Sequence, residues 1–148
     1  MKQNITRGYN RRRAPLRWVG GKVHLVPWLV KLMPEHEIYV APFGGGGSDI
    51  FCKPASRLEV YNDQSRLLTN YFDVIRDARQ RRHLCFALQY TPYSRFEFER
   101  CLATLRQPKA TPVALAHATA FICLAGYGGL DPAKATPGGF RACKTIKY

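Results

Sequence analysis

The chain has 148 residues, of which 46% are hydrophobic, so it can bury the core of one domain or of a domain with an appendage. No apolar run approaches the ~18–20 residues that cross a membrane, and we expect no secretory signal because no apolar stretch follows the basic N-terminus. The five cysteines include no Cys-x-x-Cys pair, which favours buried thiols in a reducing cytoplasm over a disulfide framework or a zinc site.

The formal net charge of +13 is distributed unevenly along the chain. Residues 1–34 hold eight basic and no acidic residues, residues 35–77 hold four basic and seven acidic, and residues 78–148 hold eleven basic and three acidic. These basic segments are either solvated surface or contacts to nucleic acid, because clustered Lys and Arg release counterions from phosphates. Residues 1–13 are predicted to form a disordered basic arm.

The first half of the chain alternates between helical and extended patterns. In order, the pattern predicts a helix over 23–33, a strand over 37–41, a glycine turn over 44–47, a short helix from Ser48, a strand over 57–62 and a helix over 64–77. Strand, turn, helix, strand and helix in this order are typical of the nucleotide-binding half of a doubly wound α/β sheet.

After Asp77 the pattern is helical only. We expect three helices, over 79–89, after a capping box formed by Ser94 and Glu97, and after Thr111. Residues 126–140 contain five glycines and two prolines, which predicts an exposed loop or a loose hairpin.

The glycine turn and the acid that follows the second strand form a candidate ligand site. Glycines let the backbone approach a ligand closely, and Asp63 follows Gly44 by nineteen residues, near the spacing at which an acid binds a ribose diol. The third glycine of the dinucleotide fingerprint is replaced here by Ser48 or Asp49. Asp63 is alternatively a helix N-cap.

Three motifs follow one another in the first half of the chain: Trp18-Val19-Gly20-Gly21-Lys22, then Pro42-Phe43-Gly44 with the glycines after it, and then Asn62-Asp63 with Leu68 and Asn70. Together they resemble the motifs of the Dam-type adenine-specific DNA methyltransferases. The resemblance extends over residues 14–142 and is more diffuse in the second half. It implies a partial Rossmann-like sheet that binds S-adenosylmethionine in residues 14–77. It also implies an appended helical segment over 78–148 that recognises double-stranded DNA, in the cytoplasm of a bacterial or phage-infected cell.

Carried over by position, the resemblance implies two sets of site residues and no metal ligand. The cofactor set is Trp18, Lys22, Phe43, Gly44, Gly46 and Asp63, with Lys22 facing the methionine carboxylate and Asp63 the ribose hydroxyls. The DNA set is Arg79, Arg81, Arg82, Arg95 and Lys109. Without the resemblance, Trp18 would be assigned to the core and Lys22 and the arginines to solvated surface.

The chain departs from the family pattern at three places. Ala41 occupies the position of the acid that usually precedes Pro-Phe, and Ala125-Gly126 replaces a polar pair. The catalytic Asp-Pro-Pro-Tyr is missing, since no two prolines are adjacent, and Asp131-Pro132-Ala133 offers no aromatic in its place.

We therefore expect an N-terminal portion of an adenine methyltransferase with no catalytic residue of its own, inactive alone. Two alternatives remain open: a non-catalytic DNA-binding remnant, and one half of a split enzyme completed by a downstream polypeptide. An NAD-type oxidoreductase is disfavoured by the imperfect glycine fingerprint and by the Trp-x-Gly-Gly-Lys motif.

Overall fold

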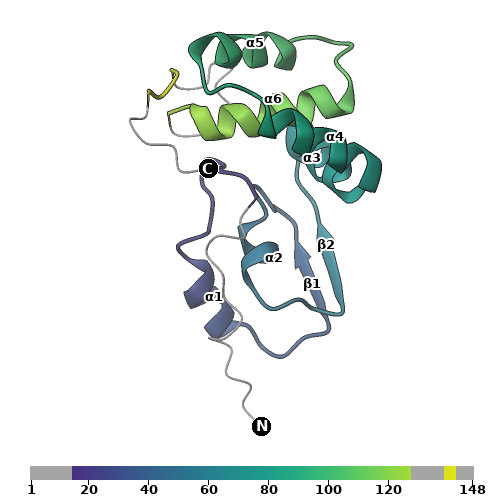
Figure 1. Cartoon of the computed structure of the whole chain (residues 1–148). Helices are drawn as coiled ribbons and strands as arrows, with labels where there is room; N and C mark the ends of the chain where they lie inside the picture. Colours follow the sequence, from purple (N-terminus) through teal and green to yellow (C-terminus); the bar gives the residue numbers. More distant parts are fainter. Residues whose placement is uncertain (1–14, 128–138, 143–148) are drawn as a thin grey trace. The chain divides into compact units, whose positions relative to one another are not determined.

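The computed structural model describes residues 15–127 and 139–142, and the chain divides into two compact units between Ser65 and Arg66 (Figure 1). Helices are combined with a small parallel sheet, which is compatible with the predicted α/β class. The predicted arm over 1–13 and residues 128–138 of the predicted loop lie outside the described residues. The functional boundary between residues 77 and 78 stays a prediction.

The first unit contains, in chain order, α1 (Val26–Leu32), β1 (Ile38–Ala41), α2 (Ser48–Cys52) and β2 (Leu58–Tyr61). All four elements lie within the predicted segments. The strands run parallel, with Ile38 paired to Leu58 and Ala41 to Tyr61, and α2 forms the crossover between them. Val26 and Val30 of α1 pack with Cys52 of α2 in the apolar core of this unit.

The two faces of this sheet have opposite character, because side chains alternate along each strand. One face carries apolar side chains that are all exposed, from Ile38, Val40, Leu58 and Val60. The other face carries side chains that are buried or half-buried, from Tyr39, Ala41, Glu59 and Tyr61. The covered face is thus the more polar one, and it is the face on which the polar contacts of this unit are concentrated.

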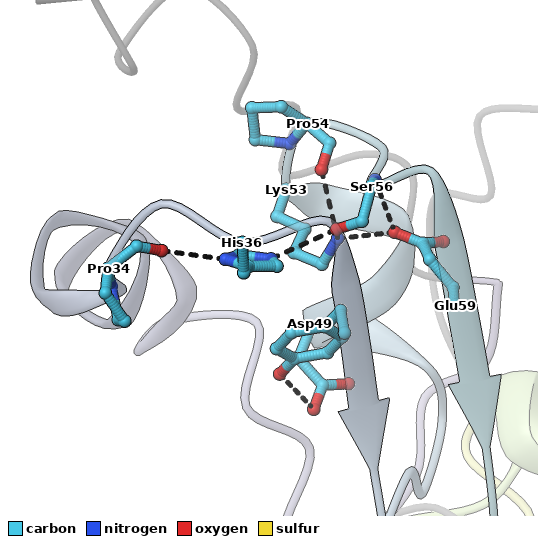
Figure 2. Close-up of polar contacts among 8 residues, drawn as sticks. Pro34, His36, Asp49, Lys53, Pro54, Ser56 and Glu59 are labelled. Carbon is cyan, nitrogen blue, oxygen red and sulfur yellow. Dashed lines mark hydrogen bonds and ion pairs between the residues drawn. The ribbon is translucent and has the colours of Figure 1, made fainter.

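A buried lysine joins the loops before the two strands (Figure 2). Lys53 is 4% exposed, and its ammonium donates to Pro54 O at 3.0 Å, to Ser56 Oγ at 2.9 Å and to the Glu59 carboxylate. His36 Nε2 lies 3.0 Å from the same Ser56 hydroxyl. A buried cation is tolerated only when it is paired and hydrogen-bonded, and Lys53 meets that condition.

The second unit is helical and contains α3 (Arg66–Arg76), α4 (Ala78–Gln89), α5 (Arg95–Leu105) and α6 (Pro112–Ala125). Helix α6 packs against each of the other three. It is apolar around most of its circumference, as expected of a helix surrounded by others, and buries Ala116, Ala118, Thr119, Phe121, Ile122, Cys123 and Ala125.

The helix starts follow the predicted caps. Ser94 Oγ accepts from the backbone N–H of Glu97 at 3.1 Å, and Thr111 Oγ1 accepts from that of Ala114 at 3.2 Å. After α6 an antiparallel bridge pairs Gly126 with Phe140, so the described ends of the predicted loop lie together. Among the described residues, no helix has the length and apolar character needed to span a bilayer.

Candidate functional site

Asp63 connects the end of β2 to the glycine turn after β1. Its Oδ2 accepts from the backbone N–H of Gly45 and its Oδ1 from that of Ser65, both at 2.8 Å. The backbone N–H of Gly44 also donates to Asn62 O at 2.9 Å. The acid and the turn that the sequence paired by spacing are therefore in direct contact, and the contact to Ser65 also supports the turn that leads into α3.

Two of the glycines are required by the packing of the chain itself. A Cβ on Gly44 would lie 2.2 Å from Cε2 of the Tyr61 ring, and one on Gly46 would lie 2.8 Å from Leu16 O. The Tyr61 hydroxyl donates to Gly45 O at 2.8 Å. Burial, with a smaller contribution from the Asp63 charge, raises the Tyr61 pKa. Tyr61 was missed in the sequence, although it directly precedes the Asn-Asp motif.

Lys22 is held from two sides at the turn. Its Nζ donates to Phe43 O at 3.1 Å and to Asp49 Oδ2 at 3.1 Å, and 35% of the Lys22 side chain is exposed. The Tyr39 hydroxyl donates to the same Asp49 oxygen at 3.3 Å. Burial and then the Asp49 charge raise the pKa of Tyr39 to about 12. The predicted cation is thus present, but as half of an ion pair.

The aromatic members of the cofactor set also lie at the turn. Phe43 is 80% exposed, whereas Trp18 is half-buried. A Cβ on Gly45 would meet Trp18 Cδ1 at 3.6 Å, so the indole borders the turn. All six predicted cofactor residues therefore lie on the glycine turn or on segments that contact it. The exposed Phe43 ring leaves a flat apolar surface free, while Trp18 also contributes to local packing.

The predicted DNA contacts are distributed over several elements. Arg79, Arg81 and Arg82 are exposed on α4, but Arg81 Nη1 donates to Ile75 O at 2.7 Å at the end of α3. Arg81 is therefore partly occupied as a helix C-cap. The Arg95 guanidinium of α5 lies 5.6 Å from the centroid of the Phe140 ring, and Lys109 is exposed after α5.

One face of α4 combines cations with aromatic rings. Arg79, Arg82, Phe86 and Tyr90 follow one another at intervals of three or four residues, which places them on one side of the helix. All are exposed, Phe86 by 65% and Tyr90 by 67%, and the two ring centroids are 4.7 Å apart. The sequence indicated the arginines, but the rings were missed because apolar residues in a helix are usually core. We call these four residues the α4 stripe.

The described histidine and cysteine residues show no ligand cluster. His117 Nε2 lies 2.7 Å from Thr91 Oγ1, and burial, with the Arg100 charge, lowers the His117 pKa. The Cys52, Cys101 and Cys123 side chains are buried, whereas Cys85 is exposed. In the described part of the chain, no three His, Cys, Asp or Glu residues are grouped to hold a metal ion.

Comparison with known proteins identifies the class. The family model of the D12 class N6 adenine-specific DNA methyltransferases matches residues 18–99, more than half of the chain. The chain therefore belongs to this family, and the predicted resemblance to Dam-type enzymes is confirmed. No curated protein matches the chain. The matched region includes the six cofactor candidates and the α4 stripe, and it ends before Lys109.

Proposed function

We propose that this chain is the cofactor-binding and DNA-binding portion of an adenine-specific DNA methyltransferase, with S-adenosylmethionine as the cofactor and double-stranded DNA as the substrate. The observation that carries the proposal is the Asp63–Gly45 hydrogen bond at the carboxyl ends of two parallel strands. Ligands of open α/β sheets bind at that edge, which supports a Rossmann-like arrangement.

The donor set at the turn fits the chemistry of S-adenosylmethionine. The exposed Phe43 ring offers stacking to the adenine, and Asp63 has accepting capacity left for the ribose hydroxyls, since each of its oxygens carries two lone pairs. Lys22 offers a cation to the carboxylate end. When bound, the cofactor supplies an activated methyl group, while the residues of this chain bind and orient it.

The α4 stripe supports binding to DNA. Arg79 and Arg82 offer cations to phosphates, and the Phe86–Tyr90 pair offers rings on which unstacked bases pack. A methyltransferase acting on adenine must take the base out of the duplex, so both contact types are useful. Arg95 and Lys109 also stay proposed phosphate contacts, but they are single cations outside the α4 stripe.

A second candidate, one part of a split enzyme, is favoured by the sheet. Parallel sheets are normally covered on both faces, and a two-stranded sheet is marginal by itself. The described sheet has two strands and an exposed apolar face bearing Ile38, Val40, Leu58 and Val60. A polypeptide that adds strands and an Asp-Pro-Pro-Tyr motif would supply what the printed sequence lacks.

Transfer of labelled methyl distinguishes these readings. The chain, purified from a host without adenine methyltransferases, is incubated with methyl-labelled S-adenosylmethionine and adenine-containing duplex DNA. We expect binding of both and no label in the DNA, because no residue pair matches the family's catalytic motif. Label that enters DNA only after addition of a separately expressed downstream polypeptide would establish the split enzyme. Label transferred by the chain alone would contradict the proposal of a binding portion.

A further inference from the structure

The most deeply buried carboxylate among the described residues belongs to Asp49, which the proposed function leaves unassigned. Asp49 is 3% exposed. Its Oδ2 accepts from Lys22 and from Tyr39, whereas its buried Oδ1 has no hydrogen-bond partner in the described structure. A buried carboxylate oxygen without a donor is costly, so Oδ1 is a candidate to accept from a group outside the described residues.

Asp49 lies over the same face of β1 as residue 41, the position at which the family's acid is missing. Tyr39 and Ala41 lie on the same face of β1, because they are two residues apart in a strand. The Tyr39 hydroxyl reaches the Asp49 carboxylate from that face, and Ala41 is 1% exposed on it. The carboxylate of Asp49, on α2, therefore lies over the face toward which an acid at residue 41 would point.

The Lys22–Asp49 ion pair is complementary in charge to a zwitterionic ligand group. Lys22 and Asp49 present a cation and an anion 3.1 Å apart, with 35% of the Lys22 side chain exposed and 4% of the Asp49 side chain. An α-amino acid group carries a carboxylate and an ammonium at a similar separation. The Lys22 ammonium pairs with the first of these, and the Asp49 oxygen without a donor pairs with the second.

We propose that Asp49 forms the anionic half of the subsite for the amino-acid end of the cofactor. Its carboxylate takes the place of the acidic residue that is absent at position 41, where the chain has Ala41. Asp49 orients Lys22 through Oδ2 and accepts from the ligand ammonium through Oδ1. This inference rests on the proposed function. It adds a residue that determines specificity for ligands with an amino-acid end over ligands with a bare nucleoside.

The test compares two ligands on the full chain by calorimetry. S-adenosylhomocysteine carries the amino-acid end, and 5′-methylthioadenosine keeps the nucleoside and the sulfur but lacks that end. We expect Asp49→Asn to weaken S-adenosylhomocysteine binding roughly 10- to 100-fold and to leave 5′-methylthioadenosine binding unchanged. The matched control is Asp73→Asn, an exposed acid of α3 that pairs with Arg76, and it should change neither affinity.

Two further measurements keep the test decisive if Asp49→Asn does not fold. The wild-type chain alone should bind S-adenosylhomocysteine much more tightly than 5′-methylthioadenosine, and Lys22→Gln, at a partly exposed side chain, should reduce that preference. Equal weakening of both ligands by Asp49→Asn, or equal wild-type affinity for both, would overturn the role of Asp49 while leaving the proposed function intact. A folded wild-type chain that binds neither ligand would overturn both.

Discussion

Asp63 and Gly45 are joined by a hydrogen bond of 2.8 Å from the glycine N–H to the Asp63 carboxylate, which fixes the glycine turn against the end of β2. The second oxygen of Asp63 accepts from Ser65. The same carboxylate thus has a structural role and the proposed ligand role. Experiments on this residue therefore have to separate a loss of binding from a loss of fold.

Asp63→Ala should weaken S-adenosylmethionine binding roughly 10- to 100-fold, because a lost charge-assisted hydrogen bond costs about 1.5–3 kcal/mol. Calorimetry measures the affinity, and urea unfolding measures how much stability the lost contact to Gly45 removes. Asp73→Ala, which removes an exposed carboxylate, is the control and should bind as the wild type does. Equal affinity in the Asp63 variant would remove this residue from the site.

Gly44→Ala should destabilise the first unit, because the added Cβ would lie 2.2 Å from the Tyr61 ring. Overpacking of this kind typically costs about 1–3 kcal/mol. Urea unfolding should show a lower midpoint, and Gly44→Ala should lower the midpoint less when it is made in a Tyr61→Ala background, where the ring is absent. Gly139→Ala, whose Cβ would meet nothing within 4 Å, is the matched control. An unchanged midpoint for Gly44→Ala would show that the ring does not require glycine at this position.

Reversing the charges of the α4 stripe should flatten the salt dependence of DNA binding. Each neutralised phosphate contributes about −0.9 to the slope of log affinity against log salt, so Arg79→Glu with Arg82→Glu should remove roughly 2 units. Arg81 is left in place because it also caps α3. Arg57→Glu with Arg66→Glu makes the same change in net charge at two exposed positions. If the two double variants bind DNA alike, the stripe is ordinary solvated surface.

His117 should make the second unit less stable in mild acid. Its pKa is lowered from 6.5 by burial and then by the Arg100 charge, so the unfolded chain takes up the proton first as the pH falls. The contribution of His117 is therefore fully present above pH 6.5 and declines below it. Urea midpoints at pH 7.5 and 5.5 should differ more for the wild type than for His117→Gln. An equal difference in both proteins would show that other groups cause the acid sensitivity.

The local part of the fold was predictable from the sequence because its signals are local. Thr111 followed by proline and the Ser94 capping box set helix starts within a few residues, and the glycine turn set the end of β1. Asp63 was found for the same reason, since a fixed spacing relates it to the turn. Such rules depend on neighbours in the chain and not on packing.

The partners of buried polar groups were not predictable, because they come from distant parts of the sequence. Lys22 was expected to face the methionine carboxylate, and its pairing with Asp49, 27 residues further on, was not foreseen. In the sequence, Asp49 was noted only as a residue that replaces the third glycine of the dinucleotide fingerprint. Phe86 and Tyr90 were missed because helical spacing does not say which face of a helix is covered.

The most direct test of the central claim is a calorimetric titration of the purified, folded chain with S-adenosylmethionine, repeated with NAD. We predict saturable binding of S-adenosylmethionine at one site per chain and no saturable binding of NAD, since the glycine fingerprint is incomplete at Ser48 and Asp49. Circular dichroism before the titration establishes that the chain is folded. A folded chain that takes up NAD but no S-adenosylmethionine, or neither ligand, would show that the glycine turn is not an S-adenosylmethionine site.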